Sequence, residues 1–163
     1  MLLPTLCRDF SGPGDILSPK PDMLAKVHSS ALYGIEAIPV TIEVHIDKGV
    51  GYHLVGLPDN AIRESNYRIA AALLNNGYRI PGKKITINMA PADLRKEGAA
   101  YDLPLALGIL VASGQLITDR LEEYLIMGEL SLDGQLKPVK GALSIALNAR
   151  ECGFEGMVLP EEN

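Results

Sequence analysis

Several residue types and sequence patterns are scarce or missing in this chain of 163 residues. Its two cysteines, Cys7 and Cys152, lie far apart and outside any Cys-x-x-Cys or Cys/His spacing, so neither a disulfide nor a structural zinc site is expected. No apolar run reaches the roughly 20 residues that span a bilayer, and the amino terminus lacks the basic start of a signal peptide. We therefore expect a cytoplasmic protein without membrane contact.

The chain also lacks the phosphate-binding sequence G-x-x-x-x-G-K-S/T. That motif supplies the backbone cradle and the lysine that hold nucleotide phosphates, so these residues are not expected to hydrolyse ATP. Among the histidines, only His45 and His53 could face each other, across a hairpin centred near Gly49. Because no carboxylate or thiolate supplies a convincing third ligand, we predict neither a metal site nor a cofactor in this chain.

Acidic residues outnumber basic ones, with 20 Asp and Glu against 15 Lys and Arg and a formal net charge of -5. This balance gives no global attraction toward nucleic acid, so DNA binding would have to depend on local basic patches. Seven basic residues gather in one part of the sequence, namely Arg63, Arg68, Arg79, Lys83, Lys84, Arg95 and Lys96. Two interpretations stay open: an ordinary solvated surface, or a rim that contacts DNA phosphates.

The 47% of hydrophobic residues is enough for the core of one compact domain. Regular patterning starts at Met23, whereas residues 1–22 contain clustered Gly and Pro and are expected to be a flexible leader or a non-native extension. Strict alternation of apolar and polar side chains over residues 40–46 predicts a strand. Weaker patterns at 25–33 and 52–55 predict two more, and we expect these three strands to form a meander.

Three helices are expected. Asp59 or Asn60 can cap a helix that runs to about Asn76, and another covers residues 142–151. Residues 103–111 are apolar nearly all round, which predicts a central buried helix with Asp102 as its N-cap. Further strands are expected at residues 83–89, 125–132, 135–139 and 156–160. This order predicts an α+β fold, a two-layer sandwich with a mixed sheet.

Two segments carry the most information, RKEGAAYDLPL at residues 95–105 and GELSLDG at residues 128–134. With NMAPADLRKEG at residues 88–98, they make residues 23–163 resemble the amino-terminal domain of the magnesium-chelatase-like AAA+ ATPases of the ComM/YifB type. That domain is similar in fold to the Lon protease domain, a ribosomal-protein-type βαβ fold, and to the carboxy-terminal domain of RadA, a DNA-repair ATPase. The resemblance implies an AAA+ module after residue 163, which would hold ATP and Mg.

The resemblance also bears on catalysis. In Lon-type enzymes the nucleophilic serine stands just after a Gly-x pair at the entrance to the buried helix, and the matching position here is Ala100. The partner lysine matches Leu143. A methyl group cannot attack a carbonyl, so we expect no catalytic residues and no peptidase activity. A displaced dyad that uses Ser144 or Lys140 is the alternative.

The resemblance therefore implies a noncatalytic domain that serves oligomer assembly and DNA engagement. Its parent would be an ATP-dependent DNA-processing or branch-migration motor with a role in competence and DNA recombination. The implied partners are other copies of the protein, as a hexamer, and DNA. A purely structural oligomerisation collar is the rival function.

Overall fold

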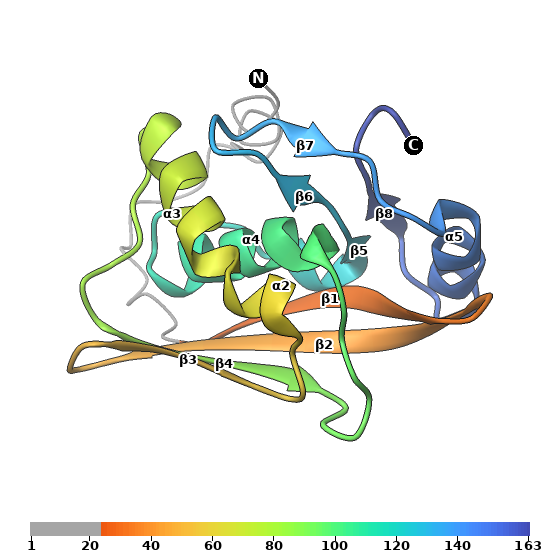
Figure 1. The fold of residues 1–163 in the computed structure, drawn as a ribbon, viewed down its shortest axis with the longest axis horizontal. Helices are drawn as coiled ribbons and strands as arrows, with labels where there is room; N and C mark the ends of the chain where they lie inside the picture. The colour runs from red at the N-terminus through yellow and green to blue at the C-terminus, as the bar shows by residue number, and fades with distance from the viewer. Residues whose placement is uncertain (1–23) are drawn as a thin grey trace.

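The computed structural model describes residues 24–163, so the predictions for residues 1–22 lie outside the described residues. A six-stranded mixed sheet forms the centre of the domain, with the strand order β3-β4-β2-β1-β5-β8 (Figure 1). Its strands are β1 (Leu24–Tyr33), β2 (Glu36–Asp47), β3 (Gly51–Val55), β4 (Lys84–Ala90), β5 (Tyr124–Ile126) and β8 (Gly156–Val158). A separate two-stranded ribbon consists of β6 (Glu129–Leu130) and β7 (Leu136–Lys137).

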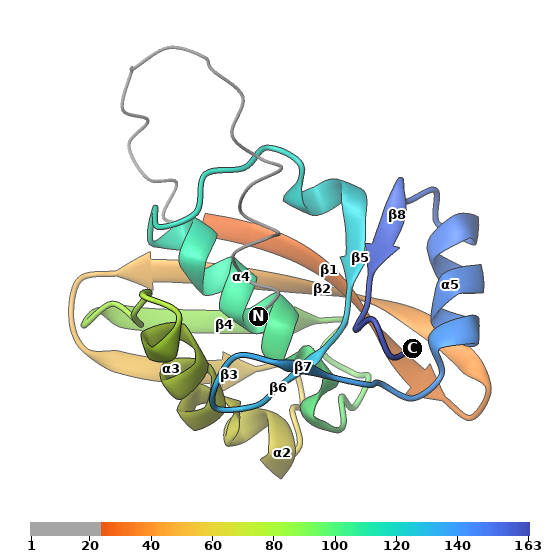
Figure 2. The ribbon, with the colours of Figure 1, turned by 90° about the horizontal axis from the view of Figure 1, so that it is seen from above.

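Four helices and two short 3-10 turns complete the described part of the chain: α2 (Asn60–Arg63), α3 (Ser65–Asn75), η1 (Ala99–Tyr101), α4 (Asp102–Ala112), η2 (Leu121–Glu123) and α5 (Ala142–Glu151). Figure 2 shows α4 lying across β1, β2 and β4, with α3 beside it. On β5, Ile126 belongs to the core under α4, while Leu125 packs with Ile145 and Ala149 of α5. The fold is therefore α+β with a mixed sheet, as predicted. None of the helices in residues 24–163 is both long and apolar enough to cross a membrane.

The alternation expected over residues 40–46 is confirmed in β2. Val40, Ile42 and Val44 have no exposed surface and face the core, whereas His45 is exposed. Helix α4 lies close above them: a Cβ added at Gly108 would stand 2.6 Å from a methyl carbon of Val44. The absence of a side chain at Gly108 thus allows the buried helix to approach the sheet closely.

The expected meander is wrong. Strand β4 lies between β2 and β3, antiparallel to β2 and parallel to β3. The chain passes from β3 through α2 and α3 into β4, which is the helical crossover that a parallel pair requires. Alternation within a strand reports its buried face but not its neighbour, because the neighbour depends on where the crossover helix packs.

The helix expected from residue 59 to 76 is present, with an interruption at Glu64 that separates α2 from α3. Asp59 caps α2, since its Oδ1 accepts a hydrogen bond from the Ile62 N–H at 2.9 Å. Gly77 follows the end of α3 with a φ of 82°, the left-handed conformation that ends many helices. The capping prediction for Asp59 is confirmed.

Candidate functional site

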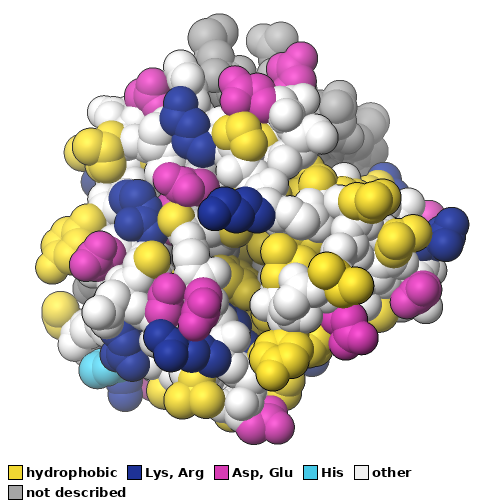
Figure 3. Space-filling model, turned by 45° about the vertical axis from the view of Figure 1, so that its right-hand side comes forward, with side chains coloured by type: hydrophobic (Ala, Val, Ile, Leu, Met, Phe, Trp, Pro, Cys, Tyr) yellow, Lys and Arg dark blue, Asp and Glu magenta, His cyan; other side chains and the backbone are white. Residues whose placement is uncertain are grey.

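A cavity of about 840 Å³ opens between the end of β1 and the segment that leads into α4. Figure 3 shows a hollow with hydrophobic side chains along it on this side of the molecule. The cavity is lined by residues 30–34, 93–95, 97–101, Met127, Glu129 and 138–140. Both information-rich sequence segments, 95–105 and 128–134, therefore contribute to one site.

Polar contacts tie the floor of this cavity together. The hydroxyl of Ser29 donates to the sulfur of Met127 at 2.7 Å, and the N–H of Ser30 lies 3.4 Å from the same sulfur. The hydroxyl of Tyr101 donates to the carbonyl of Ser30 at 3.0 Å, and burial raises the pKa of this phenol. The floor is thus a preorganised surface in which η1 is fixed to β1.

The positions compared with a Lon-type dyad lie in different surroundings. Ala100 lines the cavity at the entrance to α4. Leu143 lies on α5 with 74% of its surface exposed and is not among the lining residues. Of the alternative pair, Lys140 lines the cavity and Ser144 does not. The structure does not bring Ser144 and Lys140 together in this cavity.

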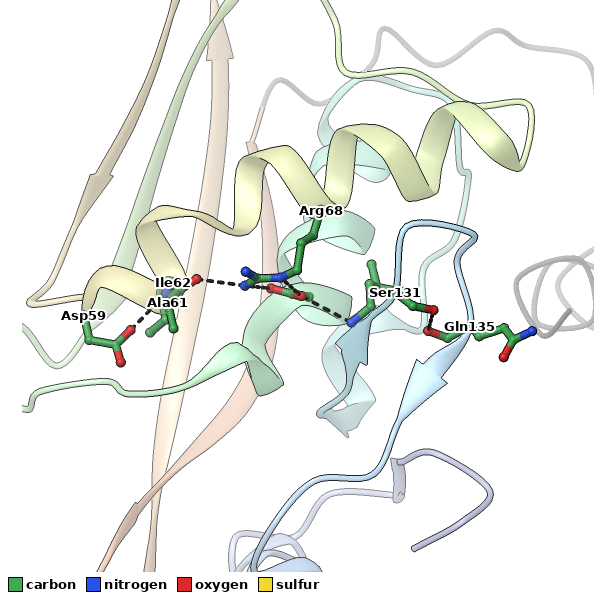
Figure 4. Close-up of polar contacts among 8 residues, drawn as sticks. Asp59, Ala61, Ile62, Arg68, Ser131 and Gln135 are labelled. Atoms are coloured by element: carbon green, nitrogen blue, oxygen red, sulfur yellow. Dashed lines mark hydrogen bonds and ion pairs between the residues drawn. The ribbon is translucent and has the colours of Figure 1, made fainter.

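Asp102 forms a buried ion pair instead of the expected helix cap. Its carboxylate is fully buried and accepts hydrogen bonds from Arg68 Nε at 2.7 Å and Nη2 at 3.0 Å. The Leu130 N–H also points to this carboxylate, at 3.2 Å. Figure 4 shows Arg68 reaching from α3 toward the start of α4, with a further bond from its guanidinium to the Ala61 carbonyl at 2.8 Å. Burial raises the pKa of Asp102, and the bond to Arg68 opposes that rise.

The backbone conformation of Asp102 explains why it does not cap α4. An N-cap residue has an extended backbone, but Asp102 has φ -59° and ψ -46° because η1 runs directly into α4. The carboxylate therefore turns toward α3 and joins α3, α4 and β6.

Lys96 is also buried, which corrects its place among the DNA-contacting candidates. Its ammonium donates to the carbonyls of Gly56 at 3.0 Å, Met89 at 2.7 Å and Pro91. Its backbone is bound on both sides, by its N–H to the Leu57 carbonyl and by its carbonyl to the Asp59 N–H. Lys96 has no exposed surface, so it cannot reach a phosphate. It fastens the segment after β3 to the segment after β4, and its burial lowers its pKa.

The other candidate basic residues do not form a single rim. Lys83 and Lys84 lie at the start of β4 and Arg95 follows its end, so roughly 20 Å of strand separates them. Arg68 is held by Asp102, and Arg79 is exposed. Arg63 and Arg95 both line a second hollow of about 590 Å³. Lys and Arg alternate with Asp and Glu on the face in Figure 3, so no surface of one sign covers it.

The sequence predicted neither this second hollow nor the backbone conformation of Leu57. The hollow's other lining residues are Leu57, Pro58, Asp59 and Asn60. Leu57 has a φ of 55°, the only positive φ outside glycine in residues 24–163. The sequence carries a weak signal for it, because Leu57 stands between a glycine and a proline, two residues that mark turns.

His45 and His53 do not face each other across a hairpin. Both pair with Thr86, from opposite sides, so β4 separates them. Within the described part of the chain, no group of three or more His, Cys, Asp or Glu is placed to hold a metal ion.

Hydrophobic side chains are exposed near the first cavity. On the β1–β2 hairpin, Tyr33 is 72% and Ile35 89% exposed. Leu32 lies close to Gly141, where α5 begins, and Leu143 and Leu147 are exposed on that helix. We call these five residues the apolar patch, and Figure 3 shows hydrophobic side chains gathered on this side.

By its fold and its cavity, the protein is an α+β domain with a hollow at the entrance to a buried helix. The sequence model of the family described as "Subunit ChlI of Mg-chelatase" matches residues 42–163. The chain belongs to this magnesium-chelatase-like family.

Curated relatives narrow the comparison to the ComM/YifB type. The uncharacterized protein YifB of Escherichia coli is 50% identical over 131 residues, which are 80% of this chain and 26% of YifB. Competence protein ComM of Haemophilus influenzae is 44% identical over 141 residues, 86% of this chain and 28% of ComM. An uncharacterized protein of Mycobacterium tuberculosis is 42% identical over the same length and shares. The resemblance found in the sequence is confirmed, and the chain spans about a quarter of the length of these relatives.

Proposed function

We propose that this domain is a noncatalytic amino-terminal domain of a magnesium-chelatase-like AAA+ ATPase, and that it serves oligomer assembly and DNA engagement. The observation that carries this proposal is the cavity beside η1, where Ala100 stands at the position of a Lon-type nucleophile and Leu143 lies outside the lining. Acyl transfer needs a nucleophile and a base within hydrogen-bond reach. An organised cavity without such a pair is suited to binding and assembly.

The parent protein, on this proposal, is a cytoplasmic ATP-dependent motor that processes DNA. Its relative from Haemophilus influenzae is named a competence protein, which supports a role in handling DNA. ATP and Mg would be bound outside these residues, in the AAA+ module. The working form would be a hexamer.

Repetition around a ring would offset the weak basic character of a single domain. The exposed candidates Arg63, Arg79, Lys83, Lys84 and Arg95 are spread over the molecule, and the net charge is -5. Each copy can therefore make only a few phosphate contacts. Linked copies would multiply those contacts through effective concentration.

The test measures duplex DNA binding by the full-length protein between about 50 and 200 mM salt. A variant with Lys83, Lys84 and Arg95 changed to Gln is compared with wild type and with a control that changes Lys26, Lys137 and Arg150 to Gln. Lys96 is left unchanged because it is buried. The first variant should bind more weakly and with a smaller salt dependence, while the control binds as wild type. Equal binding by all three proteins would remove DNA engagement from this domain.

The apolar patch supports a second candidate, a purely structural oligomerisation collar. Exposed residues such as Ile35 and Leu143 are suited to burial between subunits. Changing Tyr33, Ile35 and Leu143 to Ser in the full-length protein should shift mass photometry toward monomers. The matched control changes Val50, Ile117 and Leu132, which are exposed but outside the patch. If the domain is a structural collar, changing the apolar patch should abolish assembly. Changing the basic residues should then have no effect.

A further inference from the structure

The second hollow is lined by two cationic side chains and one carboxylate, that of Asp59. Arg63 and Arg95 line it and are exposed. The acid beside them, Asp59, already accepts the Ile62 N–H with one oxygen and the Gly98 N–H with the other, each at 2.9 Å. Arg95 pairs with Glu97 at 3.0 Å, but both side chains are more than 60% exposed. Such a pair is weak and exchanges readily with another anion.

Leu57 contributes an apolar side chain to the lining of this hollow. Its backbone has a φ of 55°, which leucine rarely adopts, and 53% of its surface is exposed. Core packing therefore does not explain the conformation. A strained residue that persists on a surface is a reason to look for a function there.

Buried contacts keep Leu57 in this conformation. The Lys96 ammonium binds the Gly56 carbonyl at 3.0 Å, and the Lys96 N–H binds the Leu57 carbonyl at 3.2 Å. The Asp59 N–H binds the Lys96 carbonyl at 3.0 Å. The loop is thus fixed before any ligand arrives, and its leucine is about half exposed in a hollow that two arginines also line.

We propose that this hollow is where the domain holds the DNA backbone, with Arg63 and Arg95 on successive phosphates and Leu57 against the sugar or base between them. Guanidinium groups bind phosphate oxygens through paired N–H donors, and an apolar side chain adds contact with the less polar parts of the nucleotide. The inference rests on the proposed role in DNA engagement and gives that role a location. Lys83 and Lys84, at the opposite end of β4, lie outside this site.

The experiment measures fluorescence anisotropy of a labelled DNA duplex with the full-length protein, at 50 and 200 mM salt. The double variant Arg63→Gln, Arg95→Gln is compared with Lys83→Gln, Lys84→Gln, which removes the same charge from the other end of β4. Each engaged copy that loses two phosphate contacts lowers the salt slope by about 1.8, so the affinity deficit of the arginine variant should be at least about 12-fold larger at 50 mM than at 200 mM. The lysine variant should lose much less affinity than the arginine variant at 50 mM salt.

Leu57→Asn tests the apolar contact separately. Asparagine tolerates a positive φ, so the loop is expected to keep its shape and the melting temperature should not fall. Binding should weaken by a similar factor at both salt concentrations, because no charge is lost. Wild-type affinity in this variant would overturn the role of Leu57.

Other outcomes separate the site from the function. If the lysine variant loses affinity and the arginine variant does not, the location is wrong while DNA engagement stands. If wild type shows no salt-dependent binding, the proposed function itself fails.

Discussion

At the scale of single residues, the buried charges are the feature that most defines this domain. Asp102 and Lys96 have no exposed surface, yet each is supplied with several hydrogen-bond partners. The sequence alone could not predict either arrangement. A carboxylate ahead of a helix resembles a cap, and a lysine beside an arginine resembles a surface charge. Yet Asp102 pairs with Arg68, 34 residues away, and one of the three carbonyls that Lys96 binds, that of Gly56, is 40 residues away.

Replacing Arg68 with Met should destabilise the protein by about 3 kcal/mol at neutral pH, because it leaves a buried carboxylate without its counter-charge. Burial raises the pKa of Asp102, and without Arg68 that pKa should rise further. The folded variant then binds a proton where the unfolded chain, with an Asp pKa of about 3.9, is still ionised. Its deficit should therefore grow as pH rises through the folded-state pKa and shrink as pH falls.

Urea unfolding at several pH values between about 4 and 8 measures this effect. The control is Arg120→Met, which removes an exposed partner of Glu123 and should leave stability nearly unchanged across the series. A deficit for Arg68→Met that does not vary with pH would contradict the ion-pair assignment.

Lys96→Met should cost about 3 kcal/mol or more, since three carbonyls lose a donor in a site closed to water. Hydrogen exchange should also become faster at residues 57–59, which Lys96 holds in place. Thermal unfolding and exchange mass spectrometry measure these changes, with the exposed Lys83→Met as the control. Equal effects of the two substitutions would show that the ammonium contacts contribute little.

At the scale of elements, periodicity located most helices and strands but not their neighbours. The buried helix at residues 103–111 and the strand at 40–46 appear where the pattern placed them. The expected meander failed, because β4 enters between β2 and β3 from a distant part of the chain. Likewise, the sequence singled out two segments that contribute to the cavity. It did not predict that the end of β1 forms another wall, because β1 meets these segments only in the folded chain.

Gly108→Ala tests the close contact between α4 and β2. Alanine favours helix by about 1 kcal/mol over glycine, but here its Cβ would lie 2.6 Å from Val44. Overpacking of this kind typically costs about 1–3 kcal/mol, so a net loss of stability is expected. The double variant Gly108→Ala, Val44→Ala should be more stable than the sum of its single changes, which a double-mutant cycle measures. Simple additivity would mean that the helix shifts freely on the sheet.

At the scale of the whole molecule, sequence similarity connects this chain to relatives that are about three times as long. Family membership follows from residues spread over 42–163, which is why the sequence could predict it. Assembly and DNA engagement are properties of surfaces. Composition did not predict how the basic residues divide between the two ends of β4.

The chain should be inert toward casein and fluorogenic peptides, because Ala100 provides no nucleophile in the cavity. Serine-directed fluorophosphonate labelling measures this directly. The control is the double variant Ser144→Ala, Lys140→Met, which should behave as wild type. Labelling that disappears in that variant would establish the displaced dyad instead.

The central position of β1 has a consequence for how the chain must fold. Its partner β2 follows immediately, but its other neighbour, β5, pairs through His28 and Leu125, almost a hundred residues apart. Contacts of such long range form slowly, because the loop between them must close first. During synthesis on the ribosome, one edge of β1 therefore stays unpaired until residues 124–126 have emerged. In any fragment that stops earlier, that edge remains free to pair with other chains. Truncations for study should include β5 and β8, which together close this side of the sheet.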